Sequence, residues 1–104
     1  MTALSDYAAL YRQGDWTIVR AVVERGDDTE LDLRLEVTLD GARASLCFTG
    51  VTDLEFRAPS PWLALTLQIV DVSADGLEGV HYKVTDPDNG TASFWCAGFE
   101  IVRE

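Results

Sequence analysis

The stretch from Glu30 to Asp40 constrains the fold of this chain more than any other, because apolar and polar residues alternate along its whole length. Successive side chains of a β-strand point to opposite faces, so a period of two predicts a strand with one buried and one solvated face. The residues predicted to be buried are Leu31, Leu33, Leu35, Val37 and Leu39. The stretch is therefore expected to be a half-buried strand.

The dipeptide Asp40-Gly41 follows this strand and suits a two-residue type I′ turn, which needs positive φ at both positions. Such a turn sets the register of a hairpin, with Leu39 opposite Ala42. Continuing this register places apolar residues of both strands on one face. The expected pairs are Val37 with Ala44, Leu35 with Leu46 and Leu33 with Phe48.

One helix and one strand are predicted before this hairpin, and the hairpin's second strand is predicted to be long. Helical spacing of apolar residues favours a short helix over Ser5–Gln13, with Ser5 as its N-cap and Gly14 as its stop. A strand is expected over Trp16–Glu24. The strand that follows the turn is expected to bend at Gly50 and to end before two prolines, which cannot donate a ladder hydrogen bond. These prolines are Pro59 and Pro61.

A second set of hairpins is predicted from Leu63 onward, where alternation resumes. Pairing across a turn at Ser73–Glu78 is expected to place Ile69 opposite Tyr82, and pairing across the next turn to place Tyr82 opposite Phe94. The same registers pair Leu67 with Val84, Val84 with Ala92, and Val80 with Cys96. On the reverse face they bring together Val70, His81 and Trp95.

These elements predict one mainly β domain over residues 1–104, a length typical of a single domain. We expect about six antiparallel strands, in a sandwich or a strongly curled sheet, with a short N-terminal helix. Cys47, Trp62 and Cys96 resemble the skeleton of an immunoglobulin domain. The hairpin register turns Cys47 outward and Cys96 inward, however, so only a sandwich without the disulfide would fit.

The charge balance limits the partners that the protein can have. With 18 acidic and 8 basic side chains, the net charge is −10, and Lys83 is the only lysine. Binding to nucleic acid or to anionic membranes needs clustered basic residues, so both are excluded as partners. No signal peptide or transmembrane segment is predicted, which favours a cytoplasmic protein with free thiols.

No motif for catalysis, metal binding or cofactor binding is recognised. His81 is the only histidine, so a site with several histidines is excluded. Cys47 is expected opposite Arg34, whose charge would lower the thiol pKa, but no histidine is placed beside it as a base. We therefore predict no catalytic residues, no metal site and no cofactor.

Two surfaces are candidates for binding a protein partner. The outward face of the Glu30–Asp40 strand is acidic, and it either aids solubility or docks a basic protein. Asp27 and Asp28 add to the acidity at its start, while only Arg34 and Arg43 offset it. The reverse face around Trp95 is either covered by another element or forms a docking surface. The predicted partner-binding residues are Asp32, Glu36, Asp40, His81 and Trp95.

The strands from Leu46 onward carry a resemblance to a known family. The segments are Leu46-Cys47-Phe48-Thr49-Gly50-Val51, Leu65-Thr66-Leu67-Gln68-Ile69, Val80-His81-Tyr82-Lys83-Val84 and Ser93-Phe94-Trp95-Cys96. In rhythm they resemble the small β-rich immunity proteins of bacterial polymorphic-toxin systems, of the type called immunity protein 50. The resemblance implies a protein that binds and neutralises a cognate toxin and needs no catalytic residues.

Three functions remain as hypotheses at this point. The first is a non-enzymatic binding protein of immunity type, whose acidity suits a basic toxin that acts on nucleic acid. The second is a small-molecule-binding β-domain with a pocket lined by Tyr82, Trp62 or Trp16. The third is an enzyme using dispersed carboxylates, which would require a buried carboxylate with a raised pKa.

Overall fold

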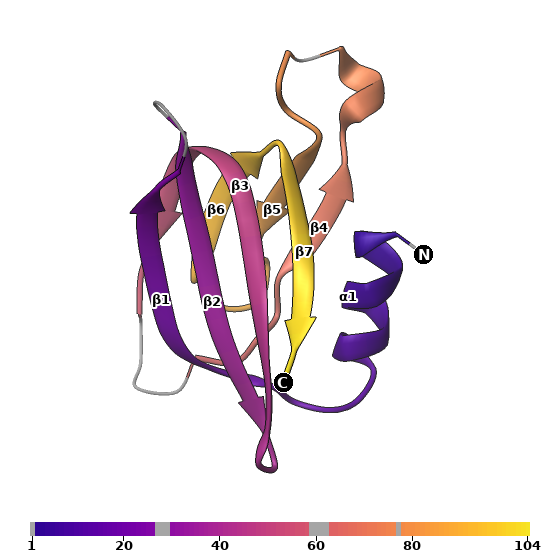
Figure 1. Ribbon diagram of the computed structural model, residues 1–104, viewed down its shortest axis with the longest axis vertical. Helices are drawn as coiled ribbons and strands as arrows, with labels where there is room; N and C mark the ends of the chain where they lie inside the picture. Colours follow the sequence, from indigo (N-terminus) through magenta and orange to yellow (C-terminus); the bar gives the residue numbers. More distant parts are fainter. Residues whose placement is uncertain (1, 27–29, 59–62, 77) are drawn as a thin grey trace.

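The computed structural model describes residues 2–26, 30–58, 63–76 and 78–104, and within them one α-helix and seven antiparallel strands (Figure 1). The elements are α1 (Ala3–Tyr11), β1 (Thr17–Arg25), β2 (Leu31–Leu39), β3 (Ala42–Phe56), β4 (Gln68–Asp71), the short 3₁₀ helix η1 (Ser73–Asp75), β5 (Tyr82–Thr85), β6 (Ala92–Cys96) and β7 (Gly98–Arg103). The expected mainly β fold with a short N-terminal helix is thereby confirmed. Five residues used in the sequence-based expectations lie outside the described residues: Asp27, Asp28, Pro59, Pro61 and Trp62.

The β2–β3 hairpin has the register that its turn predicts. Asp40 and Gly41 both have positive φ, at 49° and 87°, as a type I′ turn requires. The pairs Leu39–Ala42, Val37–Ala44, Leu35–Leu46 and Leu33–Phe48 are all formed as expected. Turn chemistry and hydrophobic pattern therefore act together to bury one face of this hairpin.

Strand β3 joins the two halves of the sheet, because it bends near its middle. Its first part pairs with β2 on one side and β7 on the other, and its last part pairs with β6. Gly50 lies at the bend with φ +61°, and a Cβ placed on it would lie 2.9 Å from the Cβ of Ala97. The sheet, in the order β1-β2-β3-β6-β5-β4 with β7 added to β3, consequently curls around its own inner face (Figure 1).

The hydrophobic core lies inside this curl and is centred on aromatic contacts. The rings of Phe48 and Phe94 meet edge to face, with their centroids 4.9 Å apart. Phe99 lies against Phe48 at 5.7 Å and meets Tyr82 edge to face at 5.0 Å. Such contacts add to the stabilisation from burial alone, by about 0.5–1.5 kcal/mol each. The core therefore ties β3, β5, β6 and β7 together.

Helix α1 packs beside β7 and the chain that leads into β4 (Figure 1). The Tyr7 hydroxyl donates a hydrogen bond to the Leu67 carbonyl at 2.6 Å, and the Trp16 indole N–H donates to the Leu10 carbonyl at 2.8 Å. Tyr7, Leu10 and Trp16 are all buried. The helix thus covers the open side of the curled sheet.

Helix α1 begins at Ala3, two residues before the expected start at Ser5. Thr2, not Ser5, is the N-cap, and Ser5 completes a capping box from the third helical position. The Thr2 hydroxyl accepts from the Ser5 backbone N–H, and the Ser5 hydroxyl accepts from the Thr2 backbone N–H. Ser5 therefore takes part in capping the helix, but the prediction that it is the N-cap is wrong. Thr2 also has a hydroxyl group and meets the N-cap preference equally well.

The predicted registers of the later hairpins are wrong by two residues each. Ile69 pairs with Val84 rather than Tyr82, and Tyr82 pairs with Cys96 rather than Phe94. Only one residue of the stretch before β4, Ala64, makes a ladder contact among the described residues, an isolated bridge to Thr17. A shift of two keeps every side chain on its predicted face, so Val84, Phe94 and Cys96 are buried as expected.

Both shifts arise in loops that are longer than their turn residues suggested. The chain between β4 and β5 contains η1, and the Val72 N–H donates to the His81 carbonyl where the loop closes. Between β5 and β6, the Asp86 carboxylate accepts hydrogen bonds from the N–H groups of Asn89 and Thr91. Asp86 therefore keeps Thr91 in the loop and delays the start of β6.

We predict that Gly50→Ala destabilises the protein by about 2–3 kcal/mol, because it combines a positive φ with a forced contact on Ala97. Gly90→Ala is the matched control, since Gly90 has φ +64° but open space around it, and should cost only about 1 kcal/mol. Urea unfolding of both variants measures the difference. Equal losses would show that the bend does not depend on close approach to Ala97.

Candidate functional site

The side chains of β1, β2, β3 and β7 that point away from the core form a surface rich in charges, here called the charged face. Its members alternate with the buried residues of the same strands, as the period of two requires. The charged face comprises Arg20, Val22, Glu24, Asp32, Arg34, Glu36, Arg43, Cys47, Thr49 and Glu100.

One half of the charged face is neutralised by ion pairs. Glu36 lies between two arginines, with Oε2 3.5 Å from Arg20 Nε and 3.8 Å from Arg34 Nη2. The side chain of Glu36 is only 31% exposed. The expectation that only Arg34 and Arg43 offset this acidic row is therefore wrong, because β1 contributes Arg20 directly opposite Glu36.

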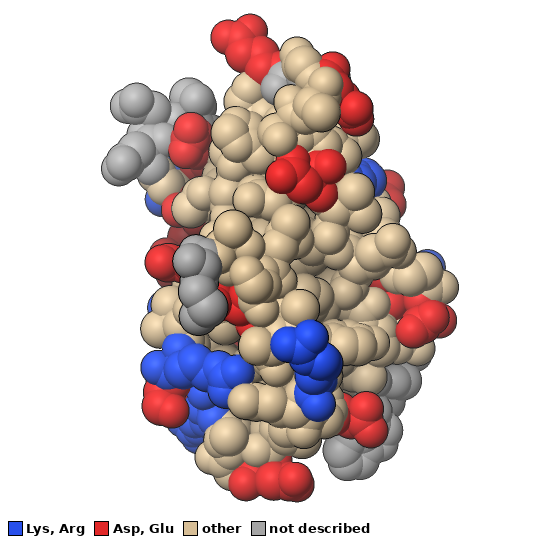
Figure 2. Space-filling view, turned by 90° about the vertical axis from the view of Figure 1, so that its right-hand side faces the viewer, with Lys and Arg blue, Asp and Glu red and all other residues tan. Residues whose placement is uncertain are grey.

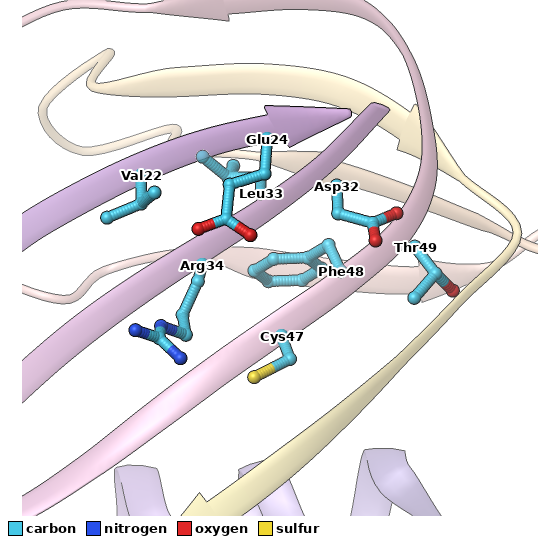
Figure 3. A pocket seen from close by; sticks show the side chains of 8 residues that line it. All are labelled: Val22, Glu24, Asp32, Leu33, Arg34, Cys47, Phe48 and Thr49. Atoms are coloured by element: carbon cyan, nitrogen blue, oxygen red, sulfur yellow. The ribbon is translucent and has the colours of Figure 1, made fainter. Parts of the chain in front are cut away.

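The other half of the charged face has Glu24, Asp32 and Arg34 along a shallow groove, with the two carboxylates turned to opposite sides (Figure 3). Glu24 and Asp32 are directly opposite on neighbouring strands, an arrangement of like charges that is unfavourable in a sheet. The Asp32 carboxylate lies over Gly26, where a Cβ would come within 2.7 Å of Oδ2. The groove, of about 180 Å³, also has Cys47 and Thr49 in its lining. An added cation at this end would relieve the repulsion between the two carboxylates.

The charges around Cys47 affect the pKa of its thiol. Burial raises its pKa, and the nearby carboxylates of Glu100 and Asp32 raise it further, whereas Arg34 lowers it less than the others raise it. Arg34 does lie opposite Cys47 and lowers its pKa as expected, but burial and the two carboxylates outweigh this effect. A thiol with a raised pKa is mostly protonated at neutral pH, so Cys47 is not arranged as a nucleophile.

The Trp95 surface has a different neighbour from the one expected. In the register of β4, β5 and β6, Lys83 lies between Val70 and Trp95, and its ammonium group sits 4.4 Å from the centroid of the Trp95 ring. The predicted grouping of Val70, His81 and Trp95 is therefore wrong. Trp95 is partly buried and Val70 is 43% exposed.

Alternation continued from Trp95 would place Phe99 and Ile101 on the same side of the sheet as Trp95, unless a bulge at Gly98 reverses it, and the structure shows the reversal. The chain changes parity between Cys96 and Gly98, where the Ala97 N–H donates to the Thr49 carbonyl. Phe99 and Ile101 consequently pack against the core, in register with Phe48 and Leu46 of β3. The reverse face is thus less apolar than the sequence pattern indicated.

The five predicted partner-binding residues do not form one site. Asp32 and Glu36 share the outer face of β2, while Asp40 lies in the exposed turn at the tip of the β2–β3 hairpin. His81 is exposed just before β5, where its N–H donates to the Cys96 carbonyl. Trp95 lies on the other half of the sheet. The structure therefore offers two separate surfaces, one charged and one centred on Lys83 and Trp95.

The single buried carboxylate among the described residues is Asp86, with 6% exposure. Burial raises its pKa, but hydrogen bonds from the Thr66 hydroxyl and from the Asn89 and Thr91 N–H groups outweigh burial and hold the pKa below its ordinary value. A catalytic acid needs the opposite shift. Asp86 is instead a loop-stabilising residue.

The aromatic residues proposed to line a pocket are engaged elsewhere. Trp16 is 2% exposed within the core, and the Tyr82 ring packs edge to face against Phe99. A wider open groove, of about 350 Å³, lies between α1 and β4 and is lined by Tyr7, Tyr11 and Leu67 among others. Seen from the side of α1, this face carries a broad uncharged area (Figure 2). Arg12 is the one charged residue in the lining of this groove, which is otherwise mostly apolar and aromatic.

Within the described ranges, no three or more His, Cys, Asp or Glu side chains are grouped in a way that would hold a metal ion. In the same part of the chain, no helix has the length and hydropathy needed to span a membrane.

Residues 14–102 match the family model described as Immunity protein PIM8. The chain belongs to the PIM8 family of immunity proteins. The match covers all seven strands except the last residue of β7 and confirms the expected class of small β-rich immunity protein, with PIM8 in place of immunity protein 50 as the matching family. No curated protein and no solved structure matches the chain.

For a PIM8 immunity protein, the relevant function is the binding of a toxin, and several charged residues on its surface were not anticipated. The sequence predicts that Arg20 and Glu24 lie in a strand. It does not predict which face they occupy, because a bulge between Ile18 and Arg20 interrupts the alternation. Lys83 was hidden by the two-residue register shift. Glu100 could have been found only by knowing that β7 leaves β6 and pairs with β3.

We predict that Asp86→Ala lowers the stability at neutral pH by about 1–3 kcal/mol, because several backbone and side-chain donors lose their acceptor. Since the pKa of Asp86 is lower in the folded state than in the unfolded state, its contribution is present above the unfolded value, near pH 4, and is lost as the pH falls through the folded value. Thermal melts at several acidic pH values should show a shallower pH dependence in the variant. Asp88→Ala, an exposed change in the same loop, should leave the melting profile near that of the wild type.

We predict that Glu100→Gln accelerates the alkylation of Cys47 by iodoacetamide at neutral pH, by about two- to threefold, because removing a nearby negative charge lowers the thiol pKa. Arg34→Gln should slow it. Peptide mass spectrometry follows the modification, with Cys96 as an internal reference whose pKa is raised to about 11 by burial. A rate unaffected by either change would place the carboxylates too far from the thiol to matter.

Proposed function

We propose that this protein neutralises a cognate toxin by binding it stoichiometrically, without catalysis, and that the toxin presents a basic surface. The match of residues 14–102 to the PIM8 immunity family carries this proposal. The net charge of −10 supports the choice of a basic partner, because opposite net charges accelerate association and disfavour wrong partners. We expect binding to take place in the cytoplasm, where Cys47 and Cys96 stay reduced.

The end of the charged face around Asp32 is the surface we assign to the toxin. Glu24 and Asp32 are directly opposite on neighbouring strands, and neither forms an ion pair among the described residues. Glu100 lies close enough to Cys47 to affect its pKa. A lysine or arginine of the toxin inserted here would satisfy both carboxylates of the opposed pair. The Glu36 end is a weaker candidate, since Arg20 and Arg34 already neutralise it.

A non-enzymatic mechanism agrees with the chemistry of the described residues. Cys47 has a raised pKa and Asp86 a lowered one, which is the reverse of what a nucleophile and a general acid require. An immunity protein that works by occupying its partner needs neither group to react. The residues that matter are then those that recognise the toxin.

The surface around Trp95 is the second candidate for toxin contact. Trp95 is partly exposed, with the Lys83 ammonium over its ring and Val70 on the other side of Lys83. Tryptophan is enriched among residues that dominate binding energy at interfaces. A cation over the ring suits an acidic partner, however, so this surface fits a basic toxin less well than the charged face does.

We predict that Asp32→Lys weakens binding to the toxin encoded by a neighbouring gene at least about tenfold, because it removes an attraction and adds a repulsion. Isothermal titration calorimetry at two salt concentrations measures the affinity and stoichiometry. Asp75→Lys, which makes the same change of charge at an exposed site in η1, should bind within about twofold of the wild type. The fold should survive, since a cation opposite Glu24 relieves a like-charge pair.

Three results would contradict the proposal in different ways. Absence of binding to every neighbouring gene product would refute the immunity function for this chain. Unchanged affinity of Asp32→Lys, with weakened binding of Trp95→Ala, would move the interface to the Trp95 surface. Full protection of the toxin's target by substoichiometric amounts of the protein would indicate turnover rather than occupation.

A further inference from the structure

Strand β1 forms one end of the sheet (Figure 1), and among the described residues none pairs with the outer edge of its second half. In an antiparallel sheet, every second residue of a strand directs its backbone N–H and C=O groups toward the neighbouring strand on one side. The residues between them direct these groups toward the other side. The β2–β3 turn makes the odd-numbered residues of β2 bond to β3, so its even-numbered residues bond to β1. The partners of those even residues are Arg20, Val22 and Glu24.

Ala21 and Val23 therefore direct their backbone N–H and C=O groups away from the sheet. Two hydrogen bonds support this assignment: Ile18, nearer the start of β1, donates outward to the Leu63 carbonyl at 2.7 Å, and Gly26 donates inward to the Glu30 carbonyl at 2.8 Å. No residue that the structure describes pairs with Ala21 or Val23 on the outer side.

The bulge between Ile18 and Arg20 lies in the first half of β1, so the second half of this edge has no bulge to protect it from pairing with another strand. It is long, it contains neither proline nor lysine, and six of the nine residues of β1 are exposed. Val23 is 52% exposed on the side that faces the core. Proteins normally shield such an edge, because its unpaired backbone groups are a template for strand addition. The opposite end of the sheet, β4, has only four residues and α1 beside it.

The sequence of β1 is complementary to itself in the antiparallel sense. Centring two copies on Val22 places Arg20 of each opposite Glu24 of the other, and Ala21 opposite Val23. The Ala21–Val23 pairs are then the hydrogen-bonded ones, in agreement with the outward direction of their backbone groups. Moving the register by two residues either way sets a charged residue opposite Val22 and loses both ion pairs.

We propose that this edge pairs with the same edge of a second copy, forming a two-fold symmetric dimer with a continuous sheet across β1. The interface is isologous, as closed dimers require. Each Arg20 would lie beside Glu24 of the second copy, which compensates the like-charge pair of Glu24 with Asp32. Val23 would be covered by Ala21 of the second copy. The inference rests on the open edge of β1 and not on the proposed function, but it uses Glu24, which the proposed toxin surface also uses.

Size-exclusion chromatography with light scattering tests the dimer over a series of protein concentrations. The wild type should approach twice its monomer mass of 11.5 kDa. Arg20→Glu and Glu24→Arg should each be monomeric, since each places like charges opposite one another twice. An equimolar mixture of these two variants should recover the dimer mass, because every cross-strand pair is then attractive. Native mass spectrometry should identify the recovered species as one copy of each variant.

Matched controls separate local pairing from overall charge. Arg12→Glu and Glu78→Arg change the net charge by the same amounts at exposed sites outside β1, and both should remain dimeric. Ala21→Pro removes an N–H that points away from β2, so it should fold but stay monomeric; circular dichroism and thermal melts check the fold of every variant.

A wild type that is monomeric at every concentration would overturn the dimer, as would dimers that persist in both charge variants. If the monomeric wild type binds toxin and Ala21→Pro does not, the open edge belongs to a strand of the toxin instead. That result would leave the proposed function intact. A dimeric wild type that binds no toxin, together with a monomeric Ala21→Pro variant that also binds none, would support this inference and refute the function.

Discussion

The bend in β3 at Gly50 is the constraint on which the rest of the structure depends. A straight strand of this length could belong to one flat sheet only, but β3 pairs with β2 and β7 before the bend and with β6 after it. The positive φ of Gly50 and its close approach to Ala97 allow the two halves of the sheet to curl around one core. Because β7 starts beside this bend, its residues return to β3, and Phe99 reaches Phe48.

The curl also decides which surfaces remain for recognition. The inner face is filled by side chains such as Phe48 and Phe94, so recognition is left to the outer surface. The outer face of β1 to β3 carries charges of both signs, of which one half is paired through Glu36 and the other leaves Glu24 and Asp32 opposed. In this member of an immunity family, the ion-paired residues around Glu36 stabilise the sheet, whereas Glu24 and Asp32 are available to a toxin.

The sequence predicted local geometry well and longer-range geometry poorly. The β2–β3 register was predictable because Asp40-Gly41 permits one turn type and because a slip by one residue would expose Leu33, Leu35 and Val37. The registers of the later hairpins could not be predicted in this way. The Asp86 carboxylate accepts hydrogen bonds from the N–H groups of Asn89 and Thr91, which lengthens the loop before β6, and η1 lengthens the loop before β5. Lys83 replaced His81 beside Trp95 for that reason alone.

By itself, the sequence determined the fold class, the half-buried β2–β3 hairpin, the strong negative charge and the absence of any second histidine. These follow from composition, from the period of two and from turn chemistry, which act between residues close along the chain. Only the tertiary structure decided that Arg20 neutralises Glu36, that Glu24 opposes Asp32 and that β1 is the end strand of the sheet. Those features depend on a bulge, a bend and the order of strands, which are set by packing between distant segments.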